Sequence, residues 1–277
     1  MPDNSHAPHP NAKPELLVNE AAEDLSKSSV QAGLDASMLD ALNRSVVIIP
    51  ARNEEQSIEQ VLSDLPPVGL VLVVDNGSTD KTGELATNAG AKVIREERPG
   101  YGRACWTGIE WLQENAAGLA FAPDYIAFLD ADYSDHPELL PLLIGPIDKD
   151  EFDFVLGSRL LGKRERGAMP AQSIYGNKLA VFLMRFFWGH RYTDLGPFRA
   201  IHRDCLIELN MQDRNFGWTV EMQIKAVHAK LRVLEIPVPY RCRIGTSKIS
   251  GTISGTIRAG YKILYTIAKY RFQLGSK

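Results

Sequence analysis

The sequence has few of the features that mark several common protein classes. Its three cysteines, Cys105, Cys205 and Cys242, are far apart and lack Cys-x-x-Cys spacing, which indicates neither a disulfide framework nor a zinc site and favours a reducing, cytoplasmic location. No apolar run approaches the ~18 to 20 residues that a membrane span needs, and the polar, proline-rich segment from Met1 to Pro14 is unlike a signal peptide. We therefore expect a protein that does not insert into the bilayer.

Two nucleotide-binding motifs are also missing. The first β-branched run, Val46 to Ile49, is followed by Pro50-Ala51-Arg52 without any glycine, so the Rossmann dinucleotide fingerprint is not met. No P-loop pattern occurs in the chain. The sequence therefore has no glycine-rich first loop of the kind that binds a triphosphate, which argues against a nucleotidyltransferase.

Charge is unevenly distributed, although the net charge is only −3. Residues 1–43 contain seven acidic and two basic residues, and we expect them to form a mobile tail with at most one short helix. Residues 44–240 are predicted to form the folded domain. Residues 241–277 contain eight basic and no acidic residues, and the apolar spacing from Thr252 to Leu274 predicts an amphipathic helix. This basic end could bind phosphates or lie on an anionic membrane, or it could pack on the domain or on a twin subunit.

The order of apolar patterns predicts one large α/β domain. Short β-branched runs at 46–50, 70–74 and 92–95 alternate with helical patterns, which is typical of a mostly parallel sheet flanked by helices. Asn53 with Gln56, and Asp135 with Glu138, have the spacing of capping boxes for two of these helices. In such a sheet, ligands bind at the carboxyl ends of the strands.

Three polar clusters follow directly on predicted strands: Arg52-Asn53-Glu54, Asp75-Asn76 and Asp130-Ala131-Asp132. Parallel strands bring such clusters to one edge, where several carboxylates require a cation or hydrogen-bond donors. Asp75 could accept the imide N–H of a base, and Asp130 could bind ribose hydroxyls or assist with a metal. Asp132 could hold a divalent cation that bridges a diphosphate. A second Asp-x-Asp sequence, Asp148-Lys149-Asp150, follows no strand and is predicted to be a solvated loop.

A glycine-rich segment, Pro99-Gly100-Tyr101-Gly102-Arg103, precedes another predicted helix. Glycines would allow the backbone to approach a ligand, and Arg103 at the helix start would face anionic oxygens. A simple tight turn explains the same pattern equally well. The segment is therefore a candidate phosphate contact only together with the acidic strand ends.

Taken in order, these motifs resemble the nucleotide-sugar half of family 2 glycosyltransferases, and they are most similar to the dolichol-phosphate mannose and glucose synthase branch. The resemblance covers about residues 45–250. The matching segments are Pro50 to Glu54, Val74 to Asp80, Gly100 to Gly108, Asp130 to Glu138, Gly157-Ser158-Arg159, Asp194 to Arg199 and Arg243 to Lys248.

This resemblance implies a GT-A fold, a UDP- or GDP-sugar donor, Mg²⁺ or Mn²⁺, inversion at the anomeric carbon and no nucleic-acid partner. It implies Asp132 and Asp130 as metal contacts and Arg159 in catalysis. The donor contacts that it implies are Pro50, Arg52, Asn53, Glu54, Asp75, Gly102, Arg103 and Asp130. The cations that it implies for a diphosphate or an acceptor phosphate are Arg199, Arg243 and Lys248.

Two departures from this branch leave the acceptor open. The branch commonly has glutamine in place of Glu221 and a small residue in place of Pro197. A phosphate acceptor is already an anion, but a sugar hydroxyl needs a general base, and Glu221 is the candidate for that role. Its alternative role is that of a structural carboxylate near a helix start. The sequence thus predicts hexose transfer to a polyprenyl or dolichyl phosphate, with a hydroxyl acceptor or a non-catalytic nucleotide-sugar binding module as alternatives.

Overall fold

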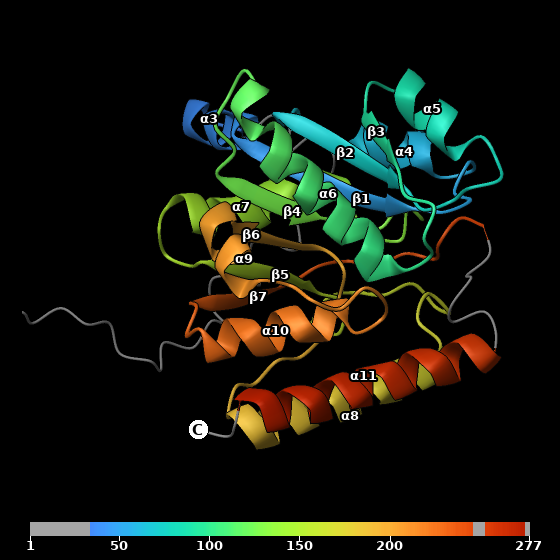
Figure 1. Ribbon diagram of the computed structural model, residues 1–277, viewed down its shortest axis with the longest axis vertical. Coiled ribbons are helices and arrows are strands. Elements are labelled where there is room, and N and C mark those ends of the chain that lie inside the picture. Colours follow the sequence, from blue (N-terminus) through green and yellow to red (C-terminus); the bar gives the residue numbers. More distant parts are fainter. Residues whose placement is uncertain (1–33, 246–252, 275–277) are drawn as a thin grey trace, which may run out of the picture.

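The computed structural model describes residues 34–245 and 253–274 (Figure 1). The strands are β1 Ser45–Ala51, β2 Leu70–Asp75, β3 Lys92–Arg95, β4 Tyr125–Phe128, β5 Phe154–Ser158, β6 Arg199–His202 and β7 Val233–Pro237. The α-helices are α3 Ala36–Asn43, α4 Ile58–Asp64, α5 Thr82–Asn88, α6 Tyr101–Asn115, α7 Leu140–Asp148, α8 Ala171–Trp188, α9 Arg203–Leu209, α10 Trp218–His228 and α11 Ile253–Leu274. Short 3-10 turns lie at Ala116–Gly118 and Pro137–Leu139.

All seven strands form one sheet in the order β3-β2-β1-β4-β6-β5-β7. Strands β3, β2, β1 and β4 are parallel, whereas β6 runs antiparallel between β4 and β5, and β7 is parallel to β5. The parallel half places the carboxyl ends of β1, β2 and β4 at one edge. The predicted mostly parallel α/β domain is therefore confirmed.

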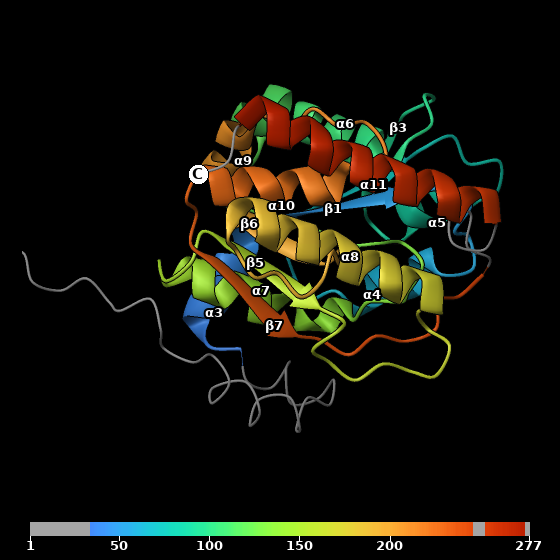
Figure 2. The same cartoon turned by 90° about the horizontal axis from the view of Figure 1, so that it is seen from below.

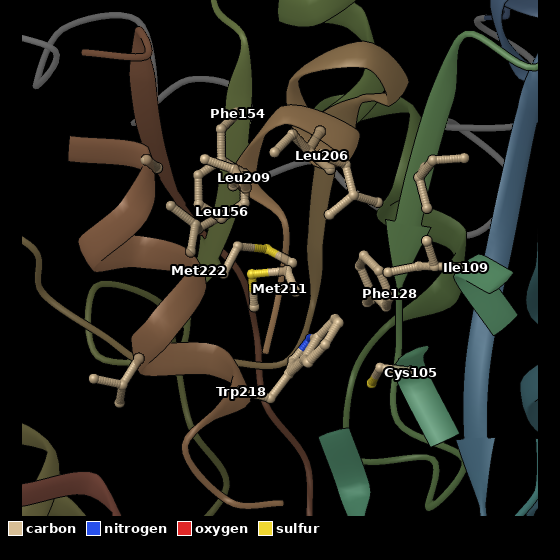
Figure 3. Packing of buried hydrophobic residues seen from close by; sticks show 14 of the residues in the cluster. Cys105, Ile109, Phe128, Phe154, Leu156, Leu206, Leu209, Met211, Trp218 and Met222 are labelled. Atoms are coloured by element: carbon tan, nitrogen blue, oxygen red, sulfur yellow. The ribbon is translucent and has the colours of Figure 1, made fainter. Parts of the chain in front are cut away.

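Alternating residues of the central strands pack into two separate layers. Val46 and Ile48 of β1 face a core that includes residues of α6, α9 and α10, whereas Val47 and Ile49 face α4 and α7. Trp218 at the start of α10 contacts Phe128 of β4 edge to face, with ring centroids 6.0 Å apart (Figure 3). Because both sheet faces are covered, the strands are apolar on both sides, which explains their continuous β-branched runs.

Helices α8, α10 and α11 lie side by side on the first of these layers (Figures 1 and 2). The predicted carboxyl-terminal helix is present, and it buries Ile267 and Tyr270 against its neighbours. None of the helices in the described ranges is long and apolar enough to cross a membrane.

The folded part of the chain begins earlier than the predicted boundary at residue 44. Helix α3 follows Asp35, whose side chain accepts the N–H of Met38, and it buries Ala41 and Leu42 completely. It packs on α7. It is the one short helix that the sequence allows for in residues 1–43, where its short apolar face gives only a faint pattern.

The two predicted capping boxes do not form. Asn53 has a left-handed backbone (φ 53°) and precedes the helix, which begins at Ile58 after Ser57. Asp135 is buried rather than at a helix cap, and within the described residues neither of its carboxyl oxygens has a hydrogen-bond partner. Burial raises the pKa of Asp135 well above its usual range. The spacing of residues in the sequence could not predict that, in the folded protein, both helices begin at other residues than the capping boxes indicate.

Candidate active site

A cleft of about 590 Å³ lies at the carboxyl ends of β1 and β4. Six of the predicted site residues line it, namely Pro50, Arg52, Glu54, Asp130, Asp132 and Arg243. The prediction that polar clusters meet at this edge is therefore correct for the first strand and for the Asp-x-Asp sequence. Both clusters reach the cleft because β1 and β4 are adjacent parallel strands.

Asp132 is held in a fixed orientation just after β4. Its Oδ1 accepts hydrogen bonds from the backbone N–H of Ser134 at 3.0 Å and from the Ser134 hydroxyl at 2.5 Å. Its Oδ2 lies 3.1 Å from Nη1 of Arg243. The carboxylate is thus buried and oriented, with Oδ2 facing the guanidinium of Arg243.

Arg243 links the two strand ends. Its Nη2 donates to Oε1 of Glu54 at 2.8 Å, while its Nη1 approaches Asp132. The backbone N–H of the next residue, Ile244, donates to the carbonyl of Asp132 at 3.0 Å. One guanidinium therefore neutralises two buried carboxylates that would otherwise repel each other.

Asp130 faces the same cleft and differs from Asp132 in its contacts. Its Oδ1 has no hydrogen-bond partner among the described residues. Burial raises the pKa of Asp130, and the neighbouring charge of Asp132 raises it further. Two close carboxylates with an unused oxygen form a donor set that suits a hard divalent cation, which would also remove their repulsion.

The glycine-rich segment forms one border of the cleft through Pro99, Gly100 and Tyr101. Gly100 donates its N–H to Oδ1 of Asn76 at 2.8 Å and has a φ of 148°, which favours glycine. A side chain there would also collide with the carbonyl of Arg214, only 2.3 Å from an ideal Cβ. The glycine is therefore needed for close packing of two loops.

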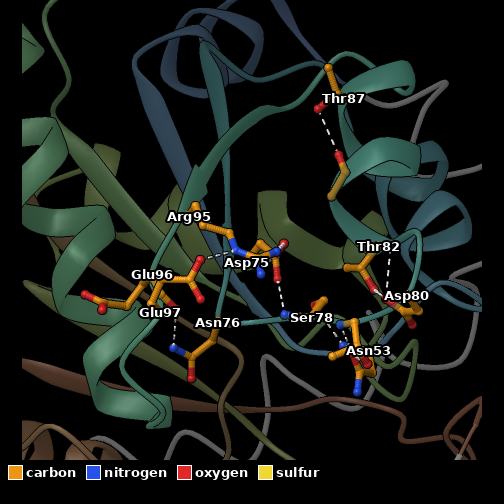
Figure 4. A network of polar contacts seen from close by, with 12 residues as sticks. Asn53, Asp75, Asn76, Ser78, Asp80, Thr82, Thr87, Arg95, Glu96 and Glu97 are labelled. Atoms are coloured by element: carbon orange, nitrogen blue, oxygen red, sulfur yellow. Dashed lines mark hydrogen bonds and ion pairs between the residues drawn. The ribbon is translucent and has the colours of Figure 1, made fainter.

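Glu96 holds the segment just before this border in place, and it is one of the residues labelled in Figure 4. It accepts hydrogen bonds from the backbone N–H and the guanidinium of Arg98, and from the hydroxyl of Thr107 at 2.8 Å. The contacts with Arg98 lower the pKa of Glu96 to about 2, although its burial opposes this. Glu96 was not predicted from the sequence, because nothing marked it as different from its neighbour Glu97.

Two residues predicted to bind the nucleotide do not line the cleft. Asp75 is buried, and its oxygens accept the N–H of Ser78 at 2.8 Å and Nη1 of Arg95 at 2.7 Å (Figure 4). Asn53 accepts the N–H of Thr79 at 2.7 Å. Both side chains hold the loop after β2 in shape and neither lines the cleft, and the donor contacts predicted for them stay predictions. Asn76, next to Asp75, lines the cleft instead.

Arg159 and Arg199 are also outside the cleft. Arg159 forms a bidentate pair with Asp194, with both distances 2.8 Å. Burial opposes ionisation of Asp194, but the charge and hydrogen bonds of Arg159 outweigh it and lower the pKa of Asp194. Arg199 is completely buried and donates to the backbone carbonyls of Thr219 and Gly196. These arginines connect loops inside the domain, and their contacts with phosphate or substrate stay predictions.

Gly102 and Arg103 pack against the loop before α10, and the donor contact predicted for them stays a prediction. A Cβ on Gly102 would lie 2.5 Å from the carbonyl of Asp213, and the N–H of Arg103 donates to the carbonyl of Arg214 at 2.9 Å. Helix α6 therefore starts directly against the loop that precedes α10. Neither residue is among those that line the cleft.

Glu221, the predicted general base, is completely buried in the first turn of α10 and does not line the cleft. Its carboxylate accepts two backbone N–H groups, from Gln212 at 2.7 Å and Asp213 at 2.6 Å, and the hydroxyl of Tyr270 at 2.5 Å. Lys225 completes the set at 2.8 Å. Its two carboxylate oxygens accept from four donors, which favours the structural alternative, and the role as a base stays a prediction.

The remaining predicted cation, Lys248, lies outside the described residues. The cleft also contains residues that the sequence did not single out as site residues, and they are Asn76, Asn215, Phe216, Arg258 and Lys262. The last two belong to α11, which the sequence assigned to a separate basic end. No sequence pattern indicates that the first half of that helix lies beside acidic residues some 130 positions earlier in the chain.

Comparison with known proteins agrees with this fold. The glycosyl transferase family 2 model matches residues 46–209. An uncharacterized glycosyltransferase of Mycobacterium tuberculosis is 35% identical over 218 residues, which cover 77% of this chain and 93% of that protein. A dolichyl-phosphate hexose transferase of Haloferax volcanii is 31% identical over 233 residues, covering 82% and 96% of the two chains.

A solved structure shares the fold at lower sequence identity. Glucosyl-3-phosphoglycerate synthase from Mycobacterium tuberculosis, crystallised with Mn²⁺, UDP-glucose and phosphoglyceric acid, superposes with a TM-score of 0.63 at 21% identity. The match covers 91% of this chain and 83% of that one. The chain therefore belongs to glycosyl transferase family 2, has the GT-A fold, and falls in the branch that resembles the dolichol-phosphate mannose and glucose synthases.

Proposed function

We propose that the protein transfers a hexose from a UDP- or GDP-sugar to a polyprenyl phosphate, with inversion at the anomeric carbon and with Mg²⁺ or Mn²⁺. The observation that favours a phosphate acceptor over a hydroxyl is the position of Glu221. A hydroxyl nucleophile needs a base within hydrogen-bond reach, whereas a phosphate oxygen attacks as an anion. Glu221 is buried, fully hydrogen-bonded and outside the cleft, so it is not available as that base.

The donor side of the site fits a nucleoside diphosphate and a metal ion. Asp132 and Asp130 would hold the ion, since they offer carboxylate oxygens and Oδ1 of Asp130 has no other partner in the described chain. Once bound, a divalent ion would supply positive charge for the leaving diphosphate. Arg243 lies 3.1 Å from Asp132, where it would stabilise the same developing charge. The structural neighbour was crystallised with Mn²⁺ and UDP-glucose, which makes UDP-glucose the first donor to test.

Helices α8 and α11 support a lipid acceptor and a peripheral contact with the membrane. They hold most of the large apolar side chains that are exposed in the described ranges, including Tyr175, Phe182, Phe186, Tyr261 and Phe272. Neither helix contains an acidic residue. An aromatic, cationic face of this kind is suited to the surface of an anionic bilayer.

The direct test is transfer of radiolabelled sugar from UDP-glucose or GDP-mannose to undecaprenyl phosphate in Mn²⁺, followed by organic extraction. The expected product releases its sugar in mild acid, because a glycosyl phosphate is acid-labile and an alkyl glycoside is not. Replacing Asp132 by asparagine should lower kcat/KM about 10²-fold or more. The matched control is Asp150→Asn in the other Asp-x-Asp sequence, where the carboxylate is exposed on the surface.

Three outcomes would contradict the proposal. An acid-stable glycoside as the only product would indicate a hydroxyl acceptor. Donor binding without transfer or hydrolysis in any condition would indicate a non-catalytic binding module. Equal activity of the Asp132→Asn and Asp150→Asn variants would exclude the assigned metal site.

A further inference from the structure

The second turn of α11 forms part of the wall of the cleft. Arg258 and Lys262 both line it, together with Phe216 of the loop before α10. The two cations are four residues apart and therefore share one face of the helix. They belong to a different wall from Asp130, Asp132 and Arg243, which come from the strand ends and the segment after β7.

Lys262 is held in place by the loop beneath it. Its Nζ lies 2.8 Å from Oδ2 of Asp213, whose Oδ1 accepts the N–H groups of Asn215 and Gly217 at 2.7 and 3.1 Å. An ideal Cβ on Gly217 would lie only 2.3 Å from the hydroxyl oxygen of Thr266, so the helix rests directly on backbone. The position of Lys262 is therefore fixed before any ligand binds.

Arg258 differs from the other cations of the cleft in having no committed partner. Arg243 is neutralised by Glu54 and Asp132, and Lys262 is paired with Asp213. Arg258 is exposed, and within the described residues it forms no hydrogen bond or ion pair. The α11 wall therefore has an excess of positive charge that faces the cleft, and an anionic group is the ligand that would compensate it.

We infer that Arg258 and Lys262 form a phosphate-monoester subsite that holds the phosphate of the acceptor. This inference rests on the proposed function. It assigns a site for the acceptor phosphate, which Arg199 does not offer because it is buried in the domain. An acceptor phosphate oxygen there would form the new bond to the anomeric carbon. The bond from that carbon to the donor's β-phosphate oxygen would break, and the nucleoside diphosphate would leave with the electron pair. No proton has to move.

The same helix suggests where the rest of the acceptor lies. Tyr261 and Tyr265, which flank Lys262, are 70% and 50% exposed, and their rings are stacked with centroids 6.3 Å apart. A phosphate bound between Arg258 and Lys262 would leave an attached isoprenoid chain beside these aromatic rings. Both a lipid phosphate and a small soluble phosphate share the recognised group, but the aromatic surface favours the lipid.

The test compares Arg258→Ala with Lys269→Ala, a change of equal charge on the same helix that does not touch the cleft. Arg258→Ala should raise KM for farnesyl phosphate about 10- to 100-fold and leave the Kd for UDP-glucose with Mn²⁺ within about twofold. Arg258→Lys should recover part of the loss, and Lys269→Ala should resemble the wild type. An equal rise in the donor Kd, or no change in either constant, would overturn the subsite.

A binding measurement separates failure of the subsite from failure of the proposed function. Farnesyl phosphate, glycerol 3-phosphate and inorganic phosphate should each raise Tm in proportion to their affinity, farnesyl phosphate most, and Arg258→Ala should abolish these shifts. If no acceptor is glycosylated but the shifts and their loss are observed, the subsite stands and the transfer reaction is wrong. If glycerol 3-phosphate protects and farnesyl phosphate does not, the lipid assignment is overturned. Absence of all shifts in the wild type overturns the subsite itself.

Discussion

The carboxylate of Glu221 links α10 to α11. It joins the loop at Gln212 and Asp213 to the hydroxyl of Tyr270, and it also pairs with Lys225. Four donors around one buried carboxylate form a network in which removal of the charge leaves several buried groups unpaired. Its effect on activity should therefore be indirect.

We expect Glu221→Gln to lower the free energy of unfolding by about 2 to 4 kcal/mol, because a neutral amide cannot accept from all four donors. At a temperature where the variant is folded, kcat per folded molecule should fall less than about tenfold, whereas loss of a general base would lower it about 10²-fold or more. Urea denaturation and active-site titration of the same sample measure the two quantities. Unchanged stability with a large fall in kcat would restore the catalytic role.

Glu96 gives a residue-scale prediction that depends on pH. Because its pKa is lowered to about 2, its contacts with Arg98 contribute stability above the unfolded-state value of 4.5, and this contribution is lost as the pH falls through about 2. Glu96→Gln should lower Tm by about 2 to 4 °C at pH 7. The difference from the wild type should shrink below pH 4.5 and vanish near pH 2.

Glu97→Gln is the matched control, since the side chain of Glu97 is 74% exposed and its partner Arg95 is half exposed. Its Tm should stay close to that of the wild type at every pH. A difference for Glu96→Gln that persists undiminished at pH 2 would show that the carboxylate acts through its shape and not through its charge.

The location of a residue could be predicted where the residue directly follows a strand. It could not be predicted where it depends on burial by distant parts of the chain. Asp130 and Asp132 had to emerge at a strand end once the apolar run before them was a strand. Arg199, by contrast, lies between Phe198 and Ala200, and nothing in the sequence indicates that its guanidinium is enclosed by backbone carbonyls. Asp75 and Asn76 are adjacent, and a shift of one residue decides which of them faces the cleft.

At the scale of elements, the parallel half of the sheet could be predicted, because its strands are short, continuous β-branched runs of the kind typical of buried strands. The antiparallel strand β6 was not predicted. Its four residues, Arg199–His202, lie directly before helix α9, and both segments mix polar and apolar residues, so no boundary between them is visible in the sequence. The placement of α11 could not be predicted either. Its contacts with α8 and α10 join segments distant in sequence, and amphipathic spacing predicts that a helix has an apolar face without indicating which partner covers it.

The contact between α10 and α11 depends on the absence of a side chain at Gly217. Gly217→Ala places a methyl group 2.3 Å from the hydroxyl oxygen of Thr266, and its backbone φ of −81° is ordinary, so the effect is one of packing alone. We expect a loss of about 1 to 3 kcal/mol in unfolding free energy, measured by urea denaturation.

Gly176→Ala on α8 provides the opposite case, because no atom lies within 4 Å of its added Cβ. Here alanine should stabilise the helix by about 0.5 to 1 kcal/mol. If Gly217→Ala were as harmless as Gly176→Ala, α11 would not rest on the backbone of the cleft loop, and the fixed position of Lys262 would have to be abandoned.

At the scale of the whole molecule, the catalytic cleft and the aromatic face share helix α11. The cations of its second turn line the cleft, and Tyr261 and Phe272 of the same helix are 70% and 87% exposed. A substrate with an anionic head and a long apolar tail would use both surfaces together. On the proposed function, this arrangement would place the cleft next to the bilayer, and none of the described helices is long and apolar enough to span it.

This arrangement predicts binding to anionic vesicles. The wild type should sediment with phosphatidylglycerol-containing vesicles, bind pure phosphatidylcholine more weakly, and dissociate as salt is raised, because the attraction between basic helices and anionic lipid is screened. Replacing Phe182 and Phe186 of α8 together by serine should weaken binding about tenfold, since each exposed ring would otherwise insert at the interface.

A double change of Leu39 and Ile207 to serine is the control, because these side chains are 38% and 39% exposed on α3 and α9, away from the proposed face. The main competitor for this face is a second copy of the chain. Two surfaces that both contain basic and no acidic residues would repel each other when paired, which favours lipid over a twin subunit. A concentration-dependent dimer that the Phe182 and Phe186 changes dissociate, with no vesicle binding by the wild type, would reverse that choice.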